Sequence, residues 1–127
     1  MSLQVELVSP ERILWSGEAD MVVARTTEGD IAFLSGHAPF IGALGIGAVT
    51  IEEPGNARTK VAVHGGFVEV SHNRVTILSD VAELAGDIDL GRAQAAKDRA
   101  EAAYHAEPTD ENDAALRRAT LRVTLAA

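Results

Sequence analysis

The period of the hydrophobic pattern changes once along this chain, at Gly86, and that change constrains the fold more than any other feature. Before Gly86, short runs of alternating apolar and polar residues are separated by turn-forming Gly, Pro, Asn and Asp. Alternation with a period of two places one face of a strand in a core and the other in water. The clearest alternating residues are Leu3, Val5 and Leu7, Val49 and Ile51, and Val75 and Ile77. Residues 1–86 are therefore predicted to form an all-β, antiparallel sandwich or flattened barrel.

After Gly86 the chain is rich in helix formers, and residues 88–106 contain seven alanines and no proline. The segment 107–110 interrupts this run with Pro108, and a second, short helix is predicted over residues 111–124. Alanines at three- and four-residue steps let two helices lie close together, so residues 87–127 are predicted to form an α-helical hairpin. Alanine buries little apolar surface, so this hairpin is expected to be held weakly. The stripe consists of Ala93, Ala96, Ala100 and Ala103.

Charge and cysteine content exclude several classes of protein. The formal net charge of −8 disfavours binding to nucleic acid and to anionic lipid, which both need clustered Lys and Arg. With no cysteine, the chain has neither disulfides nor a Cys-ligated metal. The first ten residues lack the basic region of a signal peptide. Residues 31–51 carry no Asp, Glu, Lys or Arg, but acidic flanks and internal Gly and Pro favour a buried, turn-rich sheet over a membrane span.

Five motifs, in order and at matching spacing, resemble those of epsilon subunits of F-type ATP synthases, bacterial type. The first, residues 28–40, resembles the family's G-E-L-G-I-L-P-G-H-x-P-L. Residues 65–70 resemble G-G-F-x-E-V, and residues 75–78 resemble V-T-V-L. The last two are Ala82-Glu83 and residues 88–93, which match A-E and the [IL]-D-x-x-R-A motif at the start of the first C-terminal helix.

The resemblance implies a non-catalytic rotor subunit of the central stalk. Such a subunit binds gamma, helps dock it to the ring of c subunits, and works in proton-driven ATP synthesis. It needs no cofactor, makes no lipid insertion, and sits as part of F1 on the cytoplasmic face of the bacterial plasma membrane. The hairpin of many members restrains ATP hydrolysis by extending toward the α/β head, and in some members it binds ATP as a regulatory ligand. The short second helix leads us to expect weak inhibition here.

The resemblance also implies a nucleotide site, formed by Glu83, Ile88, Asp89, Arg92, Ala93, Arg99, Arg118 and Arg122. Arginines seven or four residues apart share a helix face, so four guanidinium groups converging across a hairpin suit a triphosphate. The alternative is that these arginines are solvated or pair with Asp98, Glu101 and Asp113, each pair contributing under about 1 kcal/mol.

Two further residues are candidates for a partner interface. The resemblance places the loop around His37, and Asp30 before it, near the c ring; alternatively the His37 imidazole locks its own loop by a hydrogen bond to a nearby carbonyl. His64, Glu69 and His72 form the one cluster suited to a metal or to acid–base chemistry, and their spacing favours structural roles. No nucleophile motif is present, so no enzyme activity is expected. The competing hypothesis is an independent, cupin-like small-molecule-binding sandwich, which the lack of any His-x-His disfavours.

Overall fold

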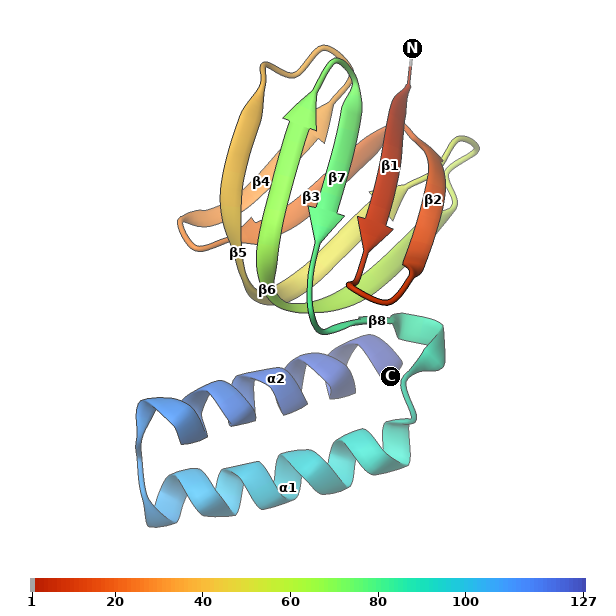
Figure 1. Ribbon diagram of the computed structural model, residues 1–127. Coiled ribbons are helices and arrows are strands. Elements are labelled where there is room, and N and C mark those ends of the chain that lie inside the picture. Colours follow the sequence, from red (N-terminus) through yellow and green to blue (C-terminus); the bar gives the residue numbers. More distant parts are fainter. Residues whose placement is uncertain (1) are drawn as a thin grey trace.

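The computed structural model describes residues 2–127 and places a β-sandwich above two helices, which confirms the predicted fold class (Figure 1). The strands come first, a single turn of 3-10 helix follows, and the two helices end the chain. Their bounds are β1 Leu3–Val8, β2 Ile13–Ala19, β3 Met21–Thr26, β4 Gly29–Leu34, β5 Phe40–Glu52, β6 Arg58–Ser71, β7 Arg74–Leu78, β8 Ala82–Leu84, η1 Ala85–Asp87, α1 Leu90–Ala106 and α2 Asp110–Ala126.

The strands form one hydrogen-bonded sheet, in the order β2-β1-β7-β6-β5-β3-β4, with β8 added against β6. The long strands β5 and β6 pair along almost their whole length and run through both layers of the sandwich (Figure 1). One pairing departs from the predicted antiparallel sheet, because β1 and β7 are parallel. Residues 31–51, the segment without charges, lie in β4, β5 and the turn between them. Within residues 2–127 no helix combines the length and the apolar character needed to cross a membrane.

Strand β6 passes from one layer to the other at Gly65 and Gly66. At this point the core-facing residues of the strand switch from odd-numbered to even-numbered positions. Val61 and Val63 face the core before the two glycines, whereas Val68 and Val70 do so after them. Both glycines have positive φ, 99° and 123°. A Cβ atom on Gly66 would lie 2.0 Å from the carbonyl oxygen of Leu78, so only glycine fits this position.

The core lies entirely between the two layers of the sandwich. It consists mainly of Val, Leu and Ile, with Phe33 as its largest side chain. Its residues are those that alternate inward along each strand, as the period of two predicts, and they all come from residues 3–77. The helices contribute only Ala93 and Ala119 as buried residues.

The hairpin forms as predicted, but its second helix is longer than expected. The side chain of Asp89 caps α1 by accepting a hydrogen bond from the Arg92 amide, and Thr109 caps α2 in the same way. Helix α2 has 17 residues, as many as α1, so the prediction of a short second helix over 111–124 is wrong. Its last turn continues because the terminal residues include the strong helix formers Leu125 and Ala126. The predicted alanine stripe also changes at its end, where Ala103 is exposed and Tyr104 is half-buried.

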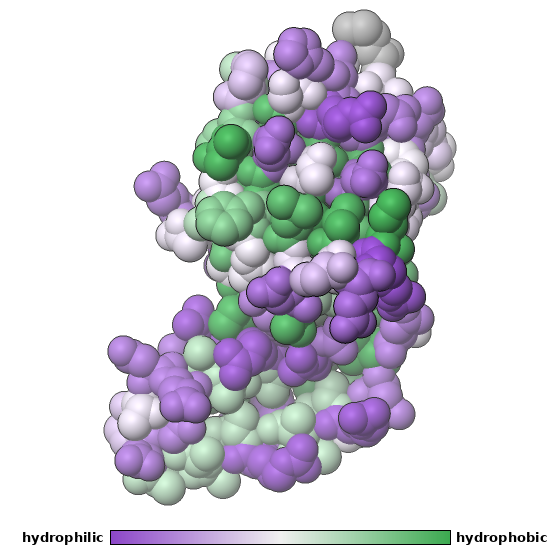
Figure 2. All heavy atoms as spheres, viewed as in Figure 1, coloured by the Kyte–Doolittle hydropathy of each residue, from purple (hydrophilic) through white to green (hydrophobic). Residues whose placement is uncertain are grey.

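The two outer faces of the sandwich differ in what covers them. The face formed by β3, β5 and the first half of β6 lies against α2. The opposite face is uncovered within residues 2–127, and apolar side chains gather there in a row that starts on β5 and crosses β6, β7, β1 and β2 (Figure 2). This apolar row consists of Ala43, Phe67, Leu78, Val8 and Ile13, each the direct cross-strand partner of the next.

Candidate functional site

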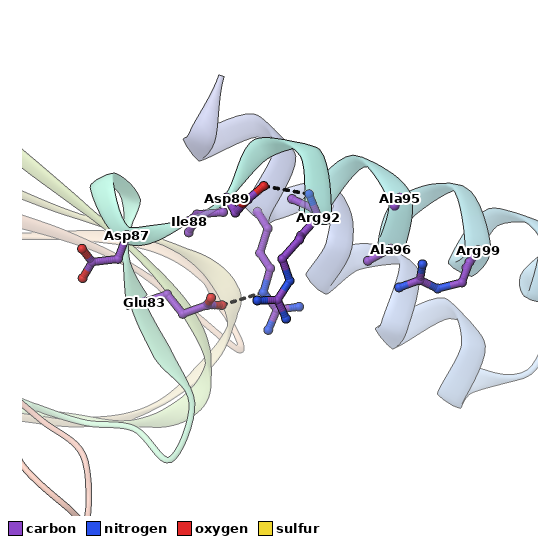
Figure 3. Close-up of a pocket in the computed structure, with 10 residues that line it drawn as sticks. Glu83, Asp87, Ile88, Asp89, Arg92, Ala95, Ala96 and Arg99 are labelled. Carbon is purple, nitrogen blue, oxygen red and sulfur yellow. Dashed lines mark hydrogen bonds and ion pairs between the residues drawn. The ribbon is translucent and has the colours of Figure 1, made fainter.

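A pocket of about 570 Å³ opens between the sandwich and the start of α1, bounded on its far side by α2 (Figure 3). This volume is within the range of roughly 300–1,000 Å³ usual for small-molecule sites. Its walls come from the end of the sandwich, the turn η1, the first three turns of α1 and the last turns of α2. The lining residues are Glu83, Asp87, Ile88, Asp89, Arg92, Ala93, Ala95, Ala96, Arg99 and Arg122.

Helix α1 supplies two of the three guanidinium groups of the pocket. Arg92 and Arg99 are two turns apart and extend from the same side of α1 (Figure 3). Ala93 is buried at the base of the pocket, and its small side chain keeps α1 close to α2. Asp89 faces the pocket too, but its Oδ1 atom already accepts a hydrogen bond of 2.9 Å from the Arg92 amide.

The third guanidinium group comes from α2 and is tied to the sandwich. The Nε atom of Arg122 donates a hydrogen bond of 2.5 Å to Oε1 of Glu83 in β8. The same oxygen lies 3.4 Å from Nε2 of His64, which belongs to β6. His64 has a side chain only 1% exposed, whereas those of Arg122 and Glu83 are about a third exposed. A carboxylate from the sandwich is thus held between a buried imidazole and a helix.

These contacts perturb the ionisation of both acid and base. Burial lowers the pKa of His64, and the positive charge of Arg122 lowers it further. Burial raises the pKa of Glu83, but the hydrogen bond and charge of Arg122 and the hydrogen bond from His64 together outweigh it and leave the pKa below its usual value. At neutral pH, therefore, Glu83 is ionised and His64 is neutral.

The electrostatics of the pocket suit an anion. Glu83 offsets the charge of Arg122, but neither Arg92 nor Arg99 has a carboxylate within 4.0 Å among residues 2–127. Guanidinium groups bind phosphate oxygens through paired N–H donors.

Comparison with known proteins decides the family. Residues 2–85 match the family described as ATP synthase, Delta/Epsilon chain, beta-sandwich domain. The chain is 44% identical to the ATP synthase epsilon chain of Streptomyces avermitilis over 120 residues, which cover 94% of this chain and 97% of that one. This chain belongs to the ATP synthase epsilon chain family.

Other relatives have the same name. The epsilon chain of Brevibacillus brevis is 48% identical over 99 residues, covering 78% of this chain and 75% of its own. Among solved structures, a chain in the mitochondrial ATP synthase of Euglena gracilis, a structure that contains OSCP, F1 and the c-ring, superposes with a TM-score of 0.80. It is 22% identical to this chain and covers 91% of it and 76% of its own length, which supports the fold. Family membership overturns the hypothesis of an independent cupin-like sandwich and makes the chain a subunit of the ATP synthase complex.

The structure brings most of the residues predicted for an epsilon-family nucleotide site to one pocket. Of the eight, only Arg118 does not line it; this residue lies one turn before Arg122 on α2. Asp87 lines the pocket and was not among the predicted residues. The carboxylates proposed as alternative partners of these arginines have other contacts: Asp98 accepts from Gln94, Glu101 pairs with Lys97, and Asp113 pairs with Arg117.

Asp30 and His37, the predicted interface residues, lie at opposite ends of β4. Asp30 is near its start, where it forms an exposed ion pair with its cross-strand partner Arg25, at 2.6 Å. The hydrogen bond from Arg25 lowers the pKa of Asp30. His37 lies in the turn after β4, where its ring packs edge-on against Phe33. Its Nδ1 atom donates to the carbonyl of Ala38 at 2.7 Å, which confirms the predicted loop-locking hydrogen bond.

His64, Glu69 and His72, for which the sequence favours structural roles over a shared metal or acid–base site, lie apart from one another. His64 faces α2, Glu69 is exposed on the opposite outer face, and His72 is in the turn after β6, where Nδ1 lies 2.8 Å from the Ser71 hydroxyl. In the part of the chain that the structure describes, no three His, Asp or Glu side chains are grouped as metal ligands. Sequence reasoning missed the contact between His64 and Glu83, for which the cross-strand pair of Ala62 and Glu83 is the structural cause.

Proposed function

We propose that this epsilon chain is the non-catalytic rotor subunit that couples gamma to the c ring during proton-driven ATP synthesis, and that its hairpin restrains ATP hydrolysis. The observation that carries the proposal is the 44% identity over 94% of the chain to an epsilon chain of almost equal length, which spans the sandwich and both helices. The subunit needs no cofactor and no active site for this role. It works as a peripheral part of F1 at the cytoplasmic face of the plasma membrane.

The apolar row is the face proposed to bind gamma. Ile13, Phe67 and Leu78 are each about half exposed, and a groove of about 460 Å³ runs beside Phe67 and Leu78. Ile41, which is 72% exposed, extends the row on β5. Large apolar side chains gathered on one uncovered face are typical of a protein interface, since their burial removes apolar surface from water.

Contact with the c ring is proposed for the two ends of β4. Asp30 lies beside the β3–β4 turn, at the opposite end of β4 from the His37 turn. Strand β4 has six residues, so its two ends lie only about 20 Å apart, and we propose that Asp30 and the His37 turn both approach the c ring. Cysteines placed at positions 30 and 37 in the assembled enzyme test each contact by crosslinking.

The pocket between α1 and the sandwich is proposed to bind ATP. Arg92 and Arg99 from α1 and Arg122 from α2 would contact the phosphates, with Arg118 nearby on α2. Glu83, Asp89, Ile88 and Ala93 would form the remaining wall. A ligand that touches both helices and the sandwich favours the docked hairpin, because a ligand shifts an equilibrium toward the state it binds better.

Reconstitution tests the proposed role. F1Fo lacking epsilon, supplied with the purified chain, should regain proton-driven ATP synthesis, and a Cys at position 30 should crosslink to a c subunit. A version ending at Gly86 should restore synthesis while leaving ATP hydrolysis higher than the full chain does. Crosslinks from position 30 only to the α/β head, or synthesis that is the same with and without the chain, would contradict the proposal.

A further inference from the structure

His64 lies inside the seam between the sandwich and the hairpin. It projects from the face of β6 that lies against α2, two residues after Ala62, which is completely buried. The His64 side chain is 1% exposed, and its Nε2–H donates to Oε1 of Glu83. Its other ring nitrogen, Nδ1, is buried with no hydrogen-bond partner in residues 2–127.

The docked hairpin therefore accommodates only the neutral imidazole. Protonation would add an N–H at Nδ1, where no acceptor is in reach, and a buried donor without an acceptor is costly. It would also place a positive charge near two others, because Arg118 and Arg122 of α2 act on His64 from across the seam. Among residues 2–127, Glu83 of β8 is the one acidic group that acts on His64. The cross-strand neighbour on β5 is Ile46, which carries no charge.

We propose that His64 is a proton-sensing positioning residue, which supports Glu83 while the hairpin is docked and releases the hairpin when the imidazole is protonated. The proposal rests on the proposed mobility of the hairpin, but it does not need nucleotide binding. Undocking α2 uncovers this face of β6, so that water can hydrate the protonated ring. Proton uptake at a single buried side chain is thereby coupled to the movement of the whole hairpin.

The direction of the pH effect follows from the two states of His64. Burial, followed by the charge of Arg122, lowers the pKa of His64 in the docked state. In the undocked state the pKa returns toward about 6.5. The docking constant is therefore at its maximum above about pH 6.5. Below this pH it falls, by up to about tenfold for each pH unit. The pKa of Glu83 is lowered, so this carboxylate keeps its charge throughout the same window.

Energy transfer between two dyes measures docking directly. Because the chain has no native cysteine, two cysteines can be introduced at chosen positions and labelled with the dyes. Exposed Arg74 on β7 and exposed Ala102 on α1, each changed to Cys, report the approach of hairpin and sandwich. Urea titrations of the full chain without nucleotide give a docking constant at each pH. We expect that constant to fall about three- to tenfold between pH 7.5 and 5.5.

Two variants separate proton sensing from packing. His64→Gln keeps an N–H donor near the position of Nε2 but does not titrate, so its docking constant should change less than about twofold over the same pH range. His72→Asn, in a turn whose φ of 51° suits Asn, is the matched control and should behave like the wild type. The proposal would be overturned if the docking constant of the wild type did not change with pH, or if the His64→Gln chain showed the wild-type pH dependence.

Direct titration of the ring covers the case in which His64→Gln does not fold. The imidazole of His64 in the wild-type chain, followed by NMR at high protein concentration without nucleotide, should titrate below the usual histidine range while the hairpin is docked. A pKa at or above about 6.5 with the hairpin docked would show that docking does not exclude the proton, and would overturn the proposal. Because neither measurement uses ATP or gamma, failure here is distinct from failure of the proposed rotor role.

Discussion

Arg122 of α2 donates its Nε hydrogen bond to Oε1 of Glu83 in β8, over 2.5 Å and across 39 residues of sequence. This ion pair joins the last helix of the epsilon chain to the sandwich at the wall of the candidate pocket. Around the pair, the helices bury only Ala93 and Ala119 completely, and Leu116 and Leu121 of α2 are half-buried against the sandwich. The pair is therefore one specific polar contact that holds the hairpin against the sandwich, beside this apolar packing.

Removing this ion pair should loosen the hairpin without unfolding the sandwich. Arg122→Ala should weaken docking by about 1 kcal/mol, since both side chains are partly exposed and the pair is screened by solvent. Hydrogen exchange of the α2 amides should become about fivefold faster, while β6 stays protected. Arg117→Ala is the matched control, because its partner Asp113 is on the same helix. Equal acceleration in both variants would contradict the assignment.

ATP binding would be visible as thermal stabilisation of the isolated chain. Millimolar ATP should raise the melting temperature, because a ligand that binds only the folded, docked chain stabilises it. Arg92→Ala and Arg122→Ala should each abolish the rise, as each removes a phosphate contact. Arg117→Ala should keep it. Calorimetry that detects no heat with millimolar ATP, or a rise that persists in Arg92→Ala, would remove the proposed ligand site.

The sequence predicts the fold well where periodicity and local signals suffice. The alternating residues of β1, β5 and β7 are buried as predicted, and Asp89 and Thr109 cap their helices. The parallel pairing of β1 with β7 was not predictable in the same way, because alternation has the same period in parallel and antiparallel strands. Helix α2 continues past Thr124, where the sequence-based prediction ended it, because no Gly or Pro follows Thr124 to stop the helix.

The candidate site was predictable only in part, for a physical reason. Arg92 and Arg99 share a face because helical spacing places them there, which the sequence reveals. The contact of His64 with Glu83 depends on the register of the three-residue strand β8 against β6, and such a short strand has too few side chains to indicate its register. The buried positions of β6 switch from odd to even numbers at Gly65 and Gly66, so alternation alone does not show which face of the sheet His64 occupies.

The sandwich, residues 1–86, is expected to fold without the hairpin. All residues of the main core lie within positions 3–77, and the family match ends at residue 85. A chain ending at Gly86 should keep a single cooperative thermal transition, lowered by a few degrees because the face under α2 becomes exposed. The measurement is circular dichroism at 218 nm (about the usual strand minimum) against temperature. A broad, non-cooperative transition in the shortened chain alone would show that the two parts fold as one.

Gly66 should tolerate no side chain. Gly66→Ala should lower the free energy of unfolding by about 1–3 kcal/mol or more, because the new Cβ meets the Leu78 carbonyl. Gly29→Ala is the control, since Gly29 also has positive φ, 119°, but has open space around its Cβ position. The difference between the two variants in urea denaturation isolates the steric clash. Equal destabilisation would mean that φ alone, and not the close approach of β6 to Leu78, makes glycine necessary at position 66.

Binding of gamma to the apolar row is tested most directly by calorimetric titration of purified gamma into the chain. The wild type should bind, and Phe67→Glu should bind about 30-fold or more weakly, because it would bury a charge at the centre of the interface. Ala102→Glu, which adds the same charge at an exposed site of α1, should bind like the wild type. A wild-type chain that does not bind gamma, or a Phe67→Glu chain that binds it equally well, would contradict the account.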